Sequence, residues 1–157
     1  MAYTSRTTAR GFTLVELVTV LVMVGILSAV AIARFSAPSD FSGPAHAEEV
    51  RAALAHARRT AVAARRFVCV SVSGNTLSLT MDPAQPDDRT TPSCSSANPV
   101  ALPGRDATGE LPSPTGVTTS SSPSSFHFKP SGEASAGAAL TAGGVSVTLR
   151  AATGSVE

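Results

Sequence analysis

The chain has 157 residues, which is enough for one small domain and a membrane segment. Twelve basic and eleven acidic residues leave it almost neutral, so its bulk charge does not indicate a polyanionic partner such as nucleic acid. Only 4% of the residues are aromatic and none is Trp, so a small core built from Val, Leu, Ala and Phe is expected.

An apolar stretch follows a basic N-terminal segment. Residues 1–10 hold two arginines and no acid, and residues 12–33 are apolar except for one glutamate and a few small polar residues. As a helix, residues 12–33 would be about 33 Å long, close to the roughly 30 Å of a bilayer core. The arginines favour a cytoplasmic N-terminus. We therefore expect residues 12–35 to be a single transmembrane helix, with the residues that follow it outside the cytoplasm.

Two other interpretations of this stretch stay open. One is a cleaved secretory signal peptide, for which residues 28–31 (Ser-Ala-Val-Ala) could serve as the cleavage site. The apolar run is longer than a signal core of about 7–15 residues, and its glycine precedes rather than follows the run. The other is a plain membrane anchor that carries a β-rich domain.

The junction between leader and apolar run reads Gly11-Phe12-Thr13-Leu14-Val15-Glu16-Leu17. It resembles the processing and methylation site of type IV prepilins and pseudopilins. The resemblance implies a leader over residues 1–11, cleavage between Gly11 and Phe12 by a prepilin peptidase, and N-methylation of Phe12. It also implies that Glu16 pairs with the amino group of Phe12 on a neighbouring subunit.

Glu16 distinguishes these interpretations physically. An ionised side chain inside the hydrocarbon region costs roughly 2.5–3.5 kcal/mol on insertion scales, although a group near the end of a span can reach the interface. In a plain anchor Glu16 would be a tolerated residue near the interface. In the prepilin interpretation its charge is neutralised by a neighbouring subunit during assembly.

A second helix is expected after a break around residues 36–44, where Pro38 and Pro44 interrupt the pattern. Apolar residues recur at helical spacing over residues 45–66. The predicted buried face is narrow and rich in alanine: Val50, Leu54, Ala57, Ala61 and Ala64.

Arg51, Arg58 and Arg65 recur every seven residues along one flank of this helix. They are a possible basic stripe that faces an acidic subunit, lipid headgroups or DNA. The alternative is an ordinary solvated helix face, in which Glu48 and Arg51 form a pair worth a few tenths of a kcal/mol.

Residues 67–81 alternate apolar and polar side chains on both sides of a Ser-Gly-Asn turn, which predicts a β-hairpin. Its apolar face should pack on the alanine-rich face of the helix, with Cys69 on the opposite face. Residues 82–125 hold eight prolines and many Ser and Thr, so we expect surface loops with one short edge strand near residues 100–102.

Cys94 lies in this loop region. Outside the cytoplasm an even number of cysteines favours a disulfide, here Cys69–Cys94, although two free thiols remain the alternative. No ligand spacing for a metal is present.

Strands are expected again over residues 126–157, at 126–133, at 143–150 and in a very short last strand. The strand that runs into Pro130-Ser131-Gly132 resembles GspH/FimT-type heads, and the chain is similar to the MSHA-type minor pilin. The resemblance implies an α+β fold: a long N-terminal helix, transmembrane in its first half, packed on an antiparallel β-sheet head over residues 36–157.

The sequence holds no nucleophile elbow, phosphate loop or dinucleotide pattern. His46, His56 and His127 are scattered, and His127 is expected to face solvent from a strand. We therefore expect no enzymatic activity, no cofactor and no metal.

The resemblance implies a structural role, as a minor pilin or pseudopilin in a type IV pilus or a type II secretion pseudopilus. Its partners would be the prepilin peptidase, other pilin subunits and the inner membrane. An alternative is a DNA-binding minor pilin for DNA uptake. Because residues 150–157 contain only Arg150 as a base and end in an acid, they do not favour that alternative.

Overall fold

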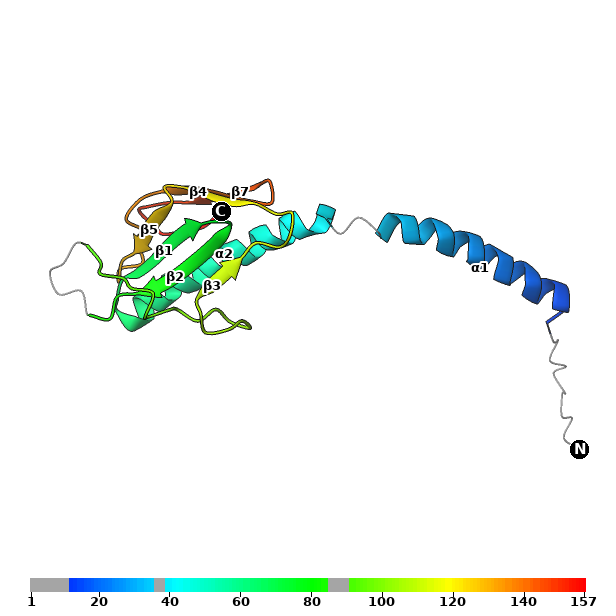
Figure 1. The fold of residues 1–157 in the computed structure, drawn as a ribbon, viewed down its shortest axis with the longest axis horizontal. Coiled ribbons are helices and arrows are strands. Elements are labelled where there is room, and N and C mark those ends of the chain that lie inside the picture. The colour runs from blue at the N-terminus through cyan, green and yellow to red at the C-terminus, as the bar shows by residue number, and fades with distance from the viewer. Residues whose placement is uncertain (1–11, 36–38, 85–90) are drawn as a thin grey trace, which may run out of the picture. The chain divides into compact units, whose positions relative to one another are not determined.

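The computed structural model describes residues 12–35, 39–84 and 91–157, and the chain forms two compact units, residues 1–38 and 39–157 (Figure 1). We call the second unit the head. The helices are α1 (Leu14–Phe35) and α2 (Ser39–Ala64). The strands are β1 (Val68–Ser73), β2 (Thr76–Met81), β3 (Glu110–Pro112), β4 (Thr119–Ser122), β5 (Ser125–Phe128), β6 (Ala138–Ala142) and β7 (Val145–Leu149).

The start of α1 is fixed by Thr13. Its hydroxyl accepts a hydrogen bond from the backbone N–H of Glu16 at 3.2 Å, which is half of a capping box, and its carbonyl accepts from Leu17 at 3.2 Å. The side chains of residues 12–29 are all exposed. Among the described residues, no helix combines the length and the apolar character that crossing a membrane requires.

The second helix begins at Ser39, six residues earlier than expected, and it continues through Pro44. The expected break was therefore wrong for residues 39–44, and residues 36–38 lie outside the described residues. Pro44 is tolerated because it lies near the start of α2 on the exposed side, where water can replace the one hydrogen bond that it cannot make.

The other end of α2 is set by Arg65, which adopts a left-handed conformation with φ of 51°. The N–H of Arg66 bonds to the carbonyl of Ala61 at 3.1 Å, and the N–H of Arg65 bonds to that of Val62 at 3.3 Å. This is the Schellman pattern of helix termination, here with arginine where glycine is usual.

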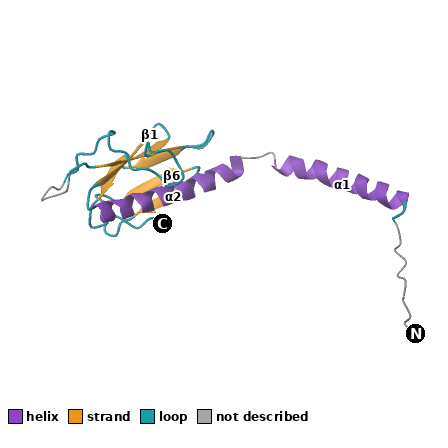
Figure 2. Ribbon diagram, turned by 90° about the horizontal axis from the view of Figure 1, so that it is seen from below, coloured by secondary structure: helices purple, strands orange, loops and turns teal. Residues whose placement is uncertain are grey.

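Two antiparallel sheets pack beside α2 (Figures 1 and 2). One has the strand order β3-β2-β1-β5, and the other has the order β4-β6-β7. The predicted hairpin is confirmed, because β1 and β2 pair with Val70 opposite Leu79, and both side chains are fully buried. Four residues of the predicted helix face are buried as well, Val50, Leu54, Ala57 and Ala61, whereas Ala64 is half-buried and Ala47 extends the face.

The expected edge strand near residues 100–102 was wrong. Residue 99 makes only an isolated bridge with Thr80, and the edge of the first sheet is β3, which pairs with β2. Pro99 and Pro103 flank this segment and cannot donate to a ladder. Val100 and Leu102 instead turn their side chains into the core.

The C-terminal strands also differ from expectation. Strand β6 was not expected, and β7 begins at Val145 because Gly143 and Gly144 form the turn before it, with φ of 57° and 81°. The short last strand is present only as an isolated bridge between Leu149 and Val156.

Candidate assembly surfaces

The first surface is α1. Apart from Phe41 and Val62, every exposed large apolar side chain of the described residues lies between Phe12 and Leu27. Phe12 is 80% exposed, and the others in this stretch are about half exposed or more. Apolar surface of this extent is unfavourable in water, so α1 requires an apolar partner. Gly11, the other residue of the expected cleavage site, lies outside the described residues.

Glu16 lies on this exposed apolar helix. The hydrogen bonds of Glu16 with side chains use its backbone: its N–H donates to the hydroxyl of Thr13, and its carbonyl accepts from the hydroxyl of Thr19. Its carboxylate makes no ion pair with any described residue. The capping pattern Thr-x-x-Glu could have located the start of the helix from sequence.

The loop that follows β2 is fastened to the head at two points. A disulfide joins Cys69 of β1 to Cys94, with 6.2 Å between the Cα atoms. Beside it, the fully buried carboxylate of Asp82 accepts hydrogen bonds from the N–H groups of Ala84 at 2.9 Å and Ser93 at 2.7 Å. Asp82 was not recognised from sequence, because its partners come from a loop without periodicity.

A buried histidine connects α2 to the strands. The ring nitrogen Nε2 of His46 lies 2.9 Å from the hydroxyl of Thr119 and 3.2 Å from that of Ser113. The hydroxyl of Ser113 donates to the carbonyl of Asn75 at 2.7 Å. His46 is 1% exposed, and its Nδ1 lies 3.3 Å from a carboxylate oxygen of Glu49. This cluster therefore links α2 to the β1–β2 turn and to β4.

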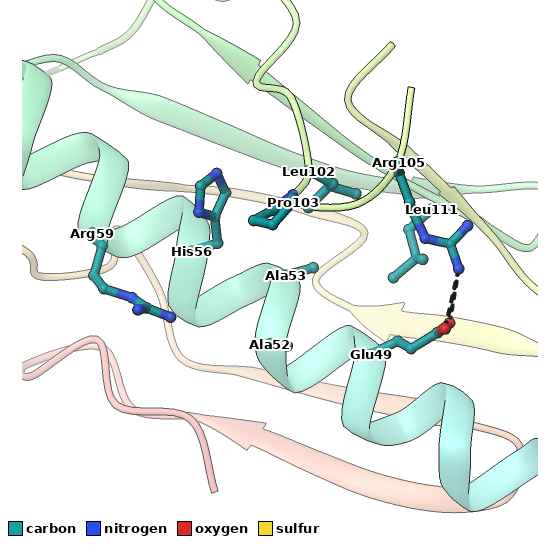
Figure 3. A pocket seen from close by; sticks show the side chains of 9 residues that line it. All are labelled: Glu49, Ala52, Ala53, His56, Arg59, Leu102, Pro103, Arg105 and Leu111. Carbon is teal, nitrogen blue, oxygen red and sulfur yellow. Dashed lines mark hydrogen bonds and ion pairs between the residues drawn. The ribbon is translucent and has the colours of Figure 1, made fainter. Parts of the chain in front are cut away.

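A groove runs along one side of α2 (Figure 3). Its apolar walls come from Ala52 and Ala53 on the helix and from Leu102, Pro103 and Leu111 opposite. Glu49 accepts two hydrogen bonds from Arg105, both of 3.1 Å, and His56 lies within hydrogen-bonding distance of the carbonyl of Ala101, at 3.0 Å. The groove has a volume of about 280 Å³, which is at the lower limit of small-molecule sites, roughly 300–1,000 Å³.

Arg51, Arg58 and Arg65 do not form the continuous stripe along α2 that their spacing suggested. Arg65 lies beyond the end of α2, whereas Arg51 is paired with Glu48 and donates to the carbonyl of Ser146 at 3.3 Å. Arg58 donates to the carbonyl of Gly132 at 3.0 Å. The structure gathers a different set in a second groove of α2, which we call the basic groove: Glu48, Arg51, Ala52, Ala55, Arg58, Arg59 and residues 154–156.

His127 is half-buried rather than solvent-facing. It pairs in register with Cys69 across β1 and β5, and its ring packs edge-on against Phe67 with 5.4 Å between centroids. Burial, and secondarily the charge of Lys129, lower the pKa of His127 below its ordinary 6.5. Its Nε2 has no hydrogen-bond partner in the described structure.

The described ranges contain no group of three His, Cys, Asp or Glu side chains placed to hold a metal. What they present instead is an exposed apolar helix and a head with grooves along its own helix.

A helix that leads into an α+β head with antiparallel strands defines the pilin-like class. The prokaryotic N-terminal methylation motif matches residues 6–32, and the model of the family "type II transport protein GspH" matches residues 46–156. Since the second match spans more than half of the chain, the chain belongs to the GspH family. It is accordingly a minor pilin or pseudopilin, a subunit that assembles into a pilus or a pseudopilus.

One solved structure is similar, the type IV minor pilin FimU of Pseudomonas aeruginosa strain PAO1. The identity is 19% and the TM-score 0.49, over 73% of this chain and 90% of that chain. No curated protein matches this chain.

Proposed function

We propose that the chain is made as a precursor whose leader, residues 1–11, is removed between Gly11 and Phe12 by a prepilin peptidase, followed by N-methylation of Phe12. Before assembly, α1 anchors the subunit in the inner membrane and the head lies in the periplasm. During assembly α1 enters the core of a pilus or pseudopilus between the helices of other pilin subunits. The single observation that carries this proposal is the concentration of exposed apolar side chains on residues 12–27.

Within that core, Glu16 pairs with the methylated amino group of Phe12 on the next subunit. Two charges in an apolar bundle are costly separately and far less so together, because each neutralises the other. The pairing therefore permits one axial offset between neighbouring helices and disfavours the rest. In support, the Glu16 carboxylate makes no ion pair with a described residue of its own chain.

The mass of the mature N-terminal peptide tests the processing step. We expect a species that begins at N-methyl-Phe12. The Gly11→Val precursor should keep its leader, because a branched side chain replaces hydrogen at the residue before the cut. An intact Met1 in the wild type, or a cut after Ala31, would overturn the proposal.

Incorporation into filaments tests Glu16. Glu16→Gln removes the charge and keeps the size, so we expect the processed variant to be lost from sheared filaments. Thr19→Ala is the matched control, since it removes another polar group from the same helix and should assemble normally. Equal incorporation of Glu16→Gln and the wild type would rule out the pairing.

The C-terminal segment does not favour the alternative role in DNA uptake. Arg150, the one base of the C-terminal segment, is held by Glu157 through contacts of 2.9 and 3.1 Å. A gel shift with duplex DNA at low and high salt would reveal such binding, because phosphate contacts weaken steeply with salt.

A further inference from the structure

The head carries a basic surface on α2 and an acidic surface on the loop before β3, and it leaves charges on both without partners among the described residues. The basic groove holds Arg58 and Arg59, both exposed. Each uses its Nε to bond a backbone carbonyl, Gly132 at 3.0 Å and Ala55 at 3.1 Å. No carboxylate of the described residues pairs with the terminal nitrogens of either guanidinium. These two charges are therefore held in place and available to a partner.

The acidic counterpart lies in the loop before β3. Asp106 and Glu110 line one shallow hollow with Gly104, Arg105, Thr108 and Pro112, and both acids are exposed. Arg105 is engaged by Glu49 at 3.1 Å, and in the described residues no base pairs with Asp106 or Glu110. We call residues 104–112 the acidic loop.

Most of the basic groove lies on the flank of α2 away from the acidic loop, and Arg59 lines both this groove and the first one, which Arg105 borders. Figure 3 shows Leu102, Pro103 and Arg105 on one side of the helix, while the C-terminal segment passes on the other. The C-terminal residues 154–156 line the basic groove. A contact between the two surfaces in different copies is therefore heterologous, the kind that continues along an open helical assembly instead of closing as a symmetric dimer.

We propose that the basic groove receives the acidic loop of a second copy of this chain, with Asp106 and Glu110 facing Arg58 and Arg59. This inference rests on the proposed function, because it names a lateral contact between assembled heads. Pairs at a solvated surface are individually weak, so the contact needs subunits that α1 already holds close together, which raises their effective concentration.

The groove suits a protein loop better than a nucleic-acid backbone. Ala52, Ala55 and Val156 give it an apolar lining beside its arginines, and a phosphate backbone would leave that apolar surface uncovered. A loop with two carboxylates and apolar neighbours such as Pro112 matches both features. Charge complementarity within one sequence is what points to a second copy.

The test uses the full processed chain in phosphatidylcholine vesicles, with a photo-reactive benzoyl-phenylalanine in place of Ala55. Irradiation should join this residue to a peptide within residues 104–112 of another copy, identified by mass spectrometry. The yield should fall as salt is raised. The same probe in place of Ser120 on β4, an exposed residue outside the groove, should give no such product.

Charge reversal supplies the decisive comparison. Arg58→Glu/Arg59→Glu should lower the yield about tenfold, and so should Asp106→Lys/Glu110→Lys, because each now opposes like charges. In a mixture of the two variants, the probe is placed on the copy with Arg58→Glu/Arg59→Glu. The cross-linking yield should then recover, because this groove again faces a loop of opposite charge. The inference would be overturned if the cross-linking yield were the same in both double variants as in the wild type, or if the mixture did not restore it. Cross-links only to a different subunit or to added DNA would overturn it as well.

The N-terminus is analysed in the same samples. A chain that begins at N-methyl-Phe12 but shows no cross-link to the acidic loop would contradict this inference and leave the proposed function intact. A chain that is never processed would sink the proposed function. Thermal unfolding of each double variant close to that of the wild type shows that its head is folded.

Discussion

Gly43 of α2 lies directly against Gly143, the first residue of the turn between β6 and β7. A Cβ on Gly43 would meet the carbonyl oxygen of Gly143 at 2.7 Å, and a Cβ on Gly143 would overlap the Cα of Gly43. The two backbones are therefore in direct contact at this point. The start of α2 can pack this closely on the second sheet because neither residue has a side chain.

We expect Gly143→Ala to destabilise the head strongly. The left-handed φ of 57° costs a non-glycine residue about 1–2 kcal/mol, and overpacking against Gly43 adds roughly 1–3 kcal/mol. The measurement is the free energy of unfolding of residues 39–157, which hold all the buried apolar side chains described.

Gly144→Ala is the matched control, because its φ is also left-handed, at 81°, but nothing lies within 4 Å of the added Cβ. Gly144→Ala should lower the free energy of unfolding only by the cost of the left-handed backbone conformation. Equal losses for the two variants would show that the close approach to Gly43 is unimportant.

Removal of the Cys69–Cys94 disulfide should lower the stability of the head by about 3.5 kcal/mol. This figure follows from the entropy of the unfolded chain with a closed loop of about 25 residues. The double serine variant and the reduced wild type should unfold at the same urea concentration, and reductant should leave the variant unchanged. A reduced wild type as stable as the oxidised protein would mean that Asp82 and its backbone partners suffice to hold the loop.

The His46 cluster should respond differently to single and double replacement. His46→Leu removes the 2.9 Å hydrogen bond between the imidazole and the hydroxyl of Thr119, which keeps its 2.6 Å bond to the hydroxyl of Ser113, so we expect a loss of about 0.5–1.5 kcal/mol in the free energy of unfolding. Thr119→Val should therefore cost less stability in the His46→Leu protein than in the wild type, because one of its two hydrogen bonds is already absent there. Equal costs of Thr119→Val in the two proteins would contradict a role for this hydrogen bond.

His127 should make the head less stable in acid. Its pKa is lowered in the folded state, first by burial and then by Lys129. Below about pH 6.5 the unfolded chain therefore binds a proton more readily than the folded head does, and the free energy of unfolding falls until the pH reaches the folded pKa.

The uncharged variant His127→Gln isolates this effect from the carboxylates. The wild type minus variant difference in the free energy of unfolding should decline between pH 7.5 and pH 5. A difference that stays constant, or an NMR titration of His127 with a midpoint above 6.5, would refute the expected direction.

The parts of the fold that could be predicted are those with local periodicity. Residues 67–81 alternate around a turn, and the alanine-rich face of α2 repeats at helical spacing, so their packing followed from the sequence. Strand β6 has no comparable signal, because Ala138–Ala142 contains a single β-branched residue. Its place depends on pairing with β4 and β7.

The candidate surfaces divide in the same way. The processing motif is contiguous, and Cys69 and Cys94 are the only cysteines, so both were accessible to sequence analysis. His46 was not, since its partner Thr119 lies 73 positions away. The arginine stripe misled because its spacing assumed a helix beyond residue 64, whereas Arg65 turns left-handed and ends it.

The position of α2 also has a mechanical consequence. Strands of both sheets contact this helix, and the glycine contact binds its first turns to the β6–β7 hairpin. We therefore expect tension applied to the head at residue 39 to be distributed by α2 over strands of both sheets, so that no single strand is pulled away from the edge of a sheet. A subunit loaded in this way should resist extraction by force better than its modest core would suggest.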